Sequence, residues 1–344
     1  MELKDLIIQL AQQPGPSGFE TRASRTAAEL LSPLVDEVRT DVMGNVIGVR
    51  RARRDNAPVV MLDAHMDEVG LIVTGYEKGA LRFHPLGGVD PRILPALEVA
   101  LHTKEGELHG VIDVLPPHVV PLADREKPLA MDKLFIDAGF DSDEEAKIHV
   151  PLGTHVTFIT PCFAMGENSL CGKSLDDRSC AAIILAVMDA LKDEPLDADV
   201  AVNLASQEEV GGRGAVTAAF GIEPDYAVAL DVTFAETPDS PKEKCVKMNG
   251  GAAIGVGAAV SRSVSEKLES LSAEKKIPYQ LEVLPIYSGT DADDIQISRT
   301  GVATGVVSLP LKYMHSPMEV IDLRDAKAVA DLLAAWLRSF GEEM

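Results

Sequence analysis

The sequence predicts an α/β fold in which a mixed sheet is covered by helices on both faces and carries an inserted small β-barrel domain. Several segments, such as Val200–Ser206, are apolar runs without polar alternation, which is typical of strands buried on both faces. In residues 72–159 apolar and polar residues alternate instead, and glycines and prolines interrupt them, as in small barrels. We therefore expect a discontinuous α/β domain from residues 1–71 and 160–344, with residues 72–159 as the insertion. A chain of 344 residues is long enough for roughly two domains.

The N-terminal segment predicts helices followed by strands. Apolar residues recur at helical spacing over residues 3–10. Ser17 and Glu20 match a capping box, which predicts a second helix from there to about Leu31. Residues 45–50 and 58–65 predict two strands, and we interpret the arginine-rich turn between them as the exposed tip of a hairpin.

After Pro161 the α/β pattern returns. It predicts a helix at residues 178–191, strands at 200–206, 226–230 and 303–309, and a closing amphipathic helix at 329–340. The glycine-rich run at residues 250–260 contains a G-x-G at Gly255 and Gly257, but Val260 stands where a dinucleotide-binding fingerprint has its third glycine. We interpret this run as a closely packed strand.

Composition excludes several classes of partner. The chain has 32 lysines and arginines against 54 aspartates and glutamates, a formal net charge of −22. So acidic a protein repels phosphate backbones and anionic membrane surfaces. No apolar run reaches the roughly 18 residues of a transmembrane helix, and the first five residues do not begin a signal peptide. We expect a cytoplasmic protein with no nucleic-acid or membrane partner, and with four reduced, mostly buried cysteines.

Residue types that bind metals stand at the carboxyl ends of the predicted strands. These residues are His65, Asp67, Glu208, Glu209, Asp231 and His315. Because the carboxyl ends of strands in an open α/β sheet face one crevice, these side chains can converge although they are scattered in sequence. The doublet Asp176-Asp177 adds two carboxylates at the start of a predicted helix.

Each of these features also has an ordinary explanation. Asp176 and Asp177 could cap a helix, and Glu208 and Glu209 could lie at a solvated strand end. Taken together, however, so many carboxylates in one crevice would be unfavourable without a cation. Two imidazoles with several carboxylates favour zinc, cobalt or manganese over calcium.

Five motifs resemble those of the metallo-aminopeptidases that assemble as tetrahedral particles, a family that includes glutamyl aminopeptidases and members named endoglucanases. The motifs are His65-Met-Asp67-Glu-Val-Gly70, Gly172-Lys-Ser-Leu-Asp176-Asp-Arg178, Gln207-Glu208-Glu209-Val-Gly211, Asp231-Val and Tyr313-Met-His315-Ser-Pro-Met-Glu319-Val. The match runs in order from Pro16 to Glu319. One departure is Ser174, where the family more often has alanine. The resemblance implies a zinc-aminopeptidase-like fold with an inserted PDZ-like domain.

The same resemblance implies two divalent metal ions per chain, with zinc as the first expectation and cobalt or manganese as alternatives. It assigns His65 and Asp231 to one ion, and Glu209 and His315 to the other. Asp176 is assigned to both ions as their bridge, in preference to its neighbour in the doublet, because the family varies the residue after the bridging aspartate.

The remaining roles follow in the same way. The resemblance makes Glu208 the general base that acts on a water held between the two ions, and Asp67 the carboxylate that orients a metal-bound histidine. Ser288, Gly289, Thr290 and Asp291 resemble a segment near the substrate, although an ordinary polar turn explains them equally well.

These assignments imply an aminopeptidase that hydrolyses N-terminal residues from short peptides. The resemblance also implies a homo-oligomer, a dodecamer built from dimers with an internal chamber. The apolar loop Val114–Leu122 fits a contact surface, whereas a plain dimer would fold this loop onto its own barrel. A glycosidase and a non-catalytic metal-binding scaffold are the alternatives, but a glycosidase leaves His65 and His315 without a role.

Overall fold

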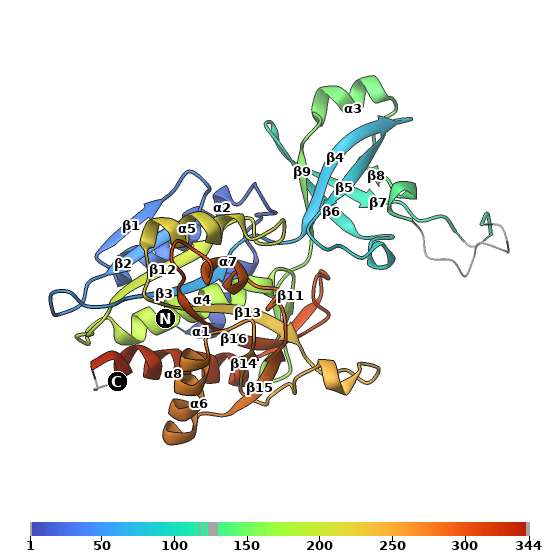
Figure 1. Cartoon of the computed structure of the whole chain (residues 1–344). Helices are drawn as coiled ribbons and strands as arrows, with labels where there is room; N and C mark the ends of the chain where they lie inside the picture. Colours follow the sequence, from blue (N-terminus) through green and yellow to red (C-terminus); the bar gives the residue numbers. More distant parts are fainter. Residues whose placement is uncertain (1, 117, 121, 123–129, 342–344) are drawn as a thin grey trace.

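The computed structural model describes residues 2–116, 118–120, 122 and 130–341 of the chain. It consists of a helix-covered sheet and a smaller barrel that stands away from it (Figure 1). The α-helices are α1 (Leu3–Ala11), α2 (Thr21–Leu31), α3 (Asp143–His149), α4 (Leu175–Leu191), α5 (Arg213–Ile222), α6 (Arg262–Lys275), α7 (Ala292–Ile295) and α8 (Leu323–Arg338). No helix in the described part of the chain combines the length and apolarity that crossing a bilayer requires.

The large sheet has eleven strands and mixes parallel with antiparallel pairs. Its strands are β1 (Glu37–Thr40), β2 (Val46–Arg50), β3 (Val59–His65), β10 (Phe163–Met165), β11 (Ser169–Gly172), β12 (Asp199–Ala205), β13 (Tyr226–Phe234), β14 (Ala252–Gly257), β15 (Tyr279–Leu284), β16 (Ala303–Lys312) and β17 (Glu319–Asp322). Their order is β1-β2-β12-β3-β13-β16-β17-β11-β10, and β14 pairs with both β16 and β15.

Helices cover both faces of this sheet. Along β3, Val60 and Leu62 face one core, which they share with apolar residues of α1, α4, α6 and α8. Met61, which points the opposite way, packs in a second core with α5 and α7. This alternation explains why the strand is apolar throughout, and it confirms the predicted fold class.

The centre of the sheet is parallel. β12 and β13 both pair with β3 in parallel, and β16 pairs in parallel with β13. His65 therefore lies opposite Ala205, and Asp231 lies opposite Ser308. The carboxyl ends of these four strands consequently meet at one edge, as expected from the sequence.

The predicted hairpin between residues 45–50 and 58–65 is wrong. Both strands exist, but β12 lies between β2 and β3 and pairs with each. The arginines of the connection are not a free tip, because Arg53 forms an ion pair of 2.7 Å with Asp197, and Arg51 pairs with Asp199 and Glu37. The residues of β12 that pair with β3 lie 140 positions further along the chain, so no local sequence pattern reveals that β12 separates the two strands.

The predicted capping box is also wrong. The second helix does begin at Thr21, but neither Ser17 nor Glu20 caps it. The Ser17 hydroxyl instead donates a 2.6 Å hydrogen bond to Asp67, and Glu20 accepts one from the Gly18 backbone N–H. Ser17 therefore connects this turn to the edge of the sheet where the candidate site lies.

A closed antiparallel barrel lies between β3 and β10 in the chain. It comprises β4 (Gly70–Glu77), β5 (Ala80–Leu86), β6 (Glu98–Thr103), β7 (Gly106–Ile112), β8 (Ile136–Asp137) and β9 (His155–Phe158), and β9 pairs with β4 to close it. Its interior is a separate apolar cluster that includes Leu71, Leu101 and Val156. The division of the chain at residues 72 and 159 stays a prediction.

The loop after β7 exposes the apolar side chains noted in the sequence. Val114, Leu115, Val119 and Leu122 are 53–81% exposed. Pro117 and Pro121 of the same loop lie outside the described residues. The described part of the loop therefore does not fold onto its own barrel.

Candidate metal centre

The five predicted ligands converge at the carboxyl edge of the parallel strands. His65 ends β3, Asp231 lies within β13, and Glu209 and His315 follow β12 and β16. Asp176 lies at the start of α4, where non-helical backbone and a cis peptide bond to Asp177 interrupt the first turn. All five line a cavity of about 470 Å³, which Glu208 also lines.

Asp176 lies between the two histidines. Its Oδ1 is 3.0 Å from Nε2 of His65, and its Oδ2 is 3.3 Å from Nε2 of His315. Nε2 of His315 is also 3.2 Å from Oε1 of Glu209, and Nε2 of His65 is 3.9 Å from Oδ1 of Asp231. The five side chains thus form two groups that share one carboxylate.

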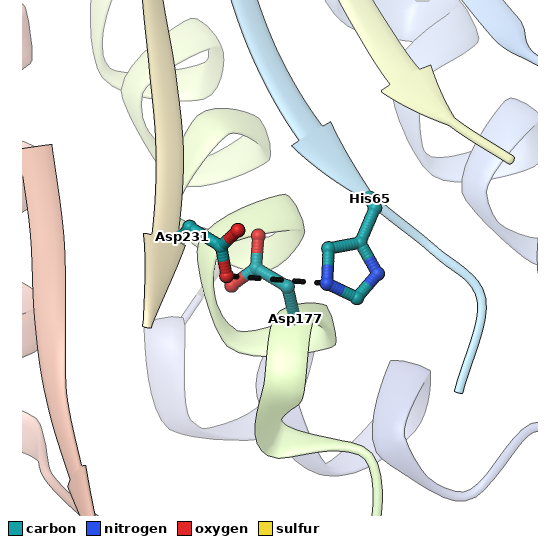
Figure 2. A group of neighbouring side chains, drawn as sticks. All are labelled: His65, Asp177 and Asp231. Atoms are coloured by element: carbon teal, nitrogen blue, oxygen red, sulfur yellow. Dashed lines mark ion pairs between the residues drawn. The ribbon is translucent and has the colours of Figure 1, made fainter. Parts of the chain in front are cut away.

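Asp177 joins one of these groups. His65, Asp177 and Asp231 each offer an atom within 4.8 Å of the others, and their side chains point toward one another from three different elements (Figure 2). His65, Asp176 and Glu209 form a second such group. Sequence analysis identified the pair Asp176-Asp177, but it chose Asp176 as the bridging ligand and gave Asp177 no role.

Asp67 contacts His65 and also the backbone of the two glutamates that follow β12. Its Oδ1 lies 3.4 Å from Nδ1 of His65. Its carboxylate also accepts hydrogen bonds from the backbone N–H groups of Glu208 and Glu209, at 2.9 and 3.1 Å, and from the Ser17 hydroxyl. One fully buried carboxylate thereby connects the ends of β3 and β12.

Two further residues position the candidate ligands, and sequence analysis gave neither a role. Glu319 is buried, and its carboxylate accepts the backbone N–H of Asp176 at 3.1 Å and that of His315 at 2.9 Å. The carbonyl of Gly88, in the segment that follows β5, lies 3.0 Å from Nδ1 of His315. Glu319 belongs to the last of the five matching motifs, and this membership was the only sign in the sequence that it has a role at the site. No sequence feature indicated a role for Gly88.

The departure at Ser174 also has a structural role. Its hydroxyl donates to Oε2 of the buried Glu68, which also accepts a 2.7 Å bond from Lys173. The backbone N–H of Gly15 donates to the other oxygen of Glu68. This network anchors the turn that leads into Asp176.

The electrostatics of the cluster favour a bound cation. Burial raises the pKa of Asp231 well above its usual range, and Asp177 adds to this effect by charge repulsion. Asp177 is fully buried, and no lysine, arginine or histidine of the described structure forms an ion pair with it. Unpaired buried carboxylates are costly, so the residues present fit divalent cations.

The two histidines respond to the same carboxylates. Burial by itself lowers the pKa of His315, but hydrogen bonds with Asp176 and Glu209 raise it to about 11. The pKa of His65 is likewise raised above its usual value by Asp176 and Asp67 despite burial. Burial raises the pKa of Glu208 to about 7, against the lowering effect of His65.

The tentative substrate segment lies partly at the cavity. Ser288, Gly289 and Thr290 line it beside the candidate ligands. Asp291 does not line it. It is 3% exposed, and burial raises the pKa of its carboxyl well above the usual range.

Residues 44–332 match the family model of the M42 glutamyl aminopeptidases. Lysyl aminopeptidase from Pyrococcus furiosus is 36% identical over 97% of this chain and 96% of that protein. The structure of aminopeptidase APDkam598 from Desulfurococcus kamchatkensis superposes with a TM-score of 0.91 and 36% identity, over 98% of this chain and 94% of that one. The Pyrococcus horikoshii TET1 peptidase, described as assembling into a tetrahedron or a large octahedral shell, has a TM-score of 0.86 and 30% identity over 98% and 99%.

The chain belongs to the M42 glutamyl aminopeptidase family, and it is a hydrolase that acts on peptide bonds. The resemblance seen in the sequence is therefore confirmed.

Proposed function

We propose that this protein is a dinuclear metallo-aminopeptidase that removes N-terminal residues from short peptides. The observation that carries the proposal is the position of Asp176, whose two oxygens face two different histidines. That arrangement supports one ion held by His65 and Asp231, and a second held by Glu209 and His315.

Asp176 is the better bridge of the doublet. Each of its oxygens approaches a different histidine, whereas Asp177 groups only with His65 and Asp231. Asp177 would then serve only the ion assigned to His65 and Asp231. We expect zinc, with cobalt or manganese as alternatives that use the same types of ligand.

Divalent ions at these residues would polarise the scissile carbonyl and make a bound water more acidic. Glu208 lines the cavity, and its Oε2 lies 4.0 Å from Nε2 of His65. This carboxylate accepts the proton of the attacking water and delivers it to the leaving amine. Asp67 fixes its position through the Glu208 backbone N–H, and it orients His65 through Nδ1.

A homo-oligomer follows as a further part of the proposal, and its specific form is a dodecamer built from dimers. The TET1 relative assembles into closed particles according to its description. The apolar side chains of the loop after β7 are exposed here, which is typical of contact surfaces. Native mass spectrometry at micromolar concentration would distinguish a dodecamer from a dimer.

A panel of aminoacyl-nitroanilides tests the function itself. Metal-depleted protein should be inactive, and zinc, cobalt or manganese should restore hydrolysis. EDTA should abolish it again. Hydrolysis of glucan substrates that survives EDTA would favour the glycosidase instead, because that chemistry needs two carboxyl groups and no metal.

A further inference from the structure

The cavity that holds the candidate ligands also contains a carboxylate that has no part in the proposed metal chemistry. Glu282, on β15, lines this cavity together with Asp231 and His315. No lysine, arginine or histidine of the described chain forms an ion pair with it, although the protein has many such pairs elsewhere. A carboxylate in a substrate-sized cavity without a cationic partner indicates a ligand that supplies one.

The position of Glu282 is built by three strands. Its Oε2 accepts a 2.8 Å hydrogen bond from the Ser308 hydroxyl on β16, and its Oε1 accepts one from the Thr233 hydroxyl on β13. Ser308 and Thr233 are themselves buried, at 2% and 5% exposure. Two buried hydroxyls thus hold a side chain that projects from the edge strand of the sheet.

The glycine-rich strand β14 lies between Glu282 and the strand that carries Ser308. β14 lies between β15 and β16, and it presents Gly255 opposite Glu282 and Ala253 opposite Ser308. A Cβ at Gly255 would lie 2.7 Å from Cδ1 of Leu284 and 3.0 Å from Cβ of Val306, so the packing of these two side chains requires glycine there. Glu282 hydrogen-bonds Ser308 on the far side of β14, so its side chain crosses a strand of small residues. This run therefore has a role other than nucleotide binding.

The carboxylate lies next to the first proposed metal position. Ser308 is the sheet neighbour of Asp231, and Thr233 is two residues beyond Asp231 on the same strand, hence on the same face. Both hydroxyls that hold Glu282 therefore flank a candidate ligand. A substrate whose scissile bond lies at the metals would place its first side chain within this part of the cavity.

The cavity that Glu282 lines also contains apolar side chains. Leu284 and Val306 are buried, and Met314 and Phe234 complete the wall. Apolar walls suit an aliphatic stem, and a hydrogen-bonded carboxylate suits an ammonium or guanidinium group at its end. Lysine and arginine are the residues that combine the two.

We propose that Glu282 determines specificity and selects substrates whose N-terminal residue is lysine or arginine. This inference rests on the proposed aminopeptidase function and adds the class of substrate. The alternative is that Glu282 holds the α-amino group, which every substrate shares. The two differ in what happens when the side-chain charge of the substrate is removed.

The test compares lysyl- with norleucyl-nitroanilide, which share a four-carbon stem and differ in the terminal ammonium. The wild-type protein, loaded with metal, should favour the lysyl substrate in kcat/KM. In Glu282→Gln, which keeps the shape of the side chain, this preference should fall about 10- to 100-fold, as expected when a charge-assisted hydrogen bond is lost. Glu282→Asp should retain part of it.

Glu274→Gln is the matched control, because it removes the same charge from the exposed surface of α6. It should leave the preference as in the wild type. A wild-type preference for norleucyl or glutamyl substrates would overturn the inference. So would an equal loss for every substrate in Glu282→Gln, which would point to the α-amino group.

Binding separates this inference from the function on which it rests. Calorimetry should show that lysinamide binds more tightly than norleucinamide, and that Glu282→Gln removes most of the difference. If no nitroanilide is hydrolysed at saturating metal, the aminopeptidase proposal fails, while these affinities still support or overturn the role of Glu282.

Discussion

The histidines of the two parts of the molecule are in opposite electrostatic environments. His65 is buried and His315 is half-buried at the edge of the large sheet, and carboxylates raise the pKa of both. In the barrel, burial lowers the pKa of His102 and brings that of His155 to about 4. The barrel pair stacks ring on ring, 4.8 Å apart, and His155 stacks in turn on Phe19 at 4.3 Å.

This difference distinguishes a binding site from packing. Carboxylates surround the sheet histidines on several sides, which is unfavourable unless a cation is present. His102 and His155 instead stack on each other and on Phe19, and burial favours the neutral form of both rings. Six of the eight histidines lie within residues 72–159, the segment that contains the barrel, so histidine number alone would have pointed to the wrong region.

The largest expected effect is on kcat, and it distinguishes a carboxylate of the metal cavity from one of the barrel. Glu208→Gln should lower kcat by at least about 10²–10⁴-fold, because glutamine cannot accept the proton, while metal content stays at the wild-type level. Glu107→Gln is the barrel counterpart, since Glu107 lies 3.5 Å from Nδ1 of His102, and it should leave kcat near wild type. Retained activity in Glu208→Gln would mean that the base is misassigned.

Glu319→Gln should weaken metal binding about 10- to 100-fold. The two oxygens of Glu319 accept backbone N–H groups of two candidate ligands, whereas glutamine offers one oxygen and one amide donor. Asp322→Asn removes a neighbouring buried carboxylate that caps α8, and it should change thermal stability but not metal affinity. Competition with a chromogenic chelator measures the metal affinity of the two variants. Equal affinities for the two variants would contradict a positioning role for Glu319.

Gly88→Ala tests the contact between the barrel side and the site. A Cβ there would lie 2.7 Å from Nδ1 of His315, so this ring must move and the ion assigned to it should bind several-fold more weakly. Gly75→Ala within β4 meets only ordinary contacts, at 3.7 Å or more, and should bind metal normally. Unchanged stoichiometry and affinity in Gly88→Ala would show that His315 does not depend on this contact.

The smallest effect concerns acid stability. Because His155 has its pKa lowered in the folded barrel, the unfolded chain binds a proton that the folded chain does not, and stability falls as the pH drops from about 6.5 to about 4. His155→Phe preserves the stack and removes this linkage. Its melting temperature should fall less than that of the wild type between pH 7 and pH 5. Equal falls in the melting temperature of the variant and the wild type would show that His155 is not the source of this pH dependence.

The sequence predicts those features that depend on the pattern of apolar residues along each strand and on the parallel direction of neighbouring strands. Parallel apolar strands place their carboxyl ends together, so the convergence of His65, Asp231 and His315 needed no distant contact to be foreseen. The contact between Gly88 and His315 spans 227 residues, and no local pattern reports it. Ser17 matched a capping box because the same hydroxyl can cap a helix or support a carboxylate, and only the folded position distinguishes these roles.

The metal content of four proteins tests the central claim most directly. We expect two ions per chain in the wild type, and two in the barrel variant His102→Ala. His315→Ala should retain one ion, and Asp176→Asn should weaken both, since it removes the shared carboxylate. Measured by native mass spectrometry at saturating zinc, a single ion in the wild type, or two firmly bound ions in Asp176→Asn, would contradict the dinuclear site.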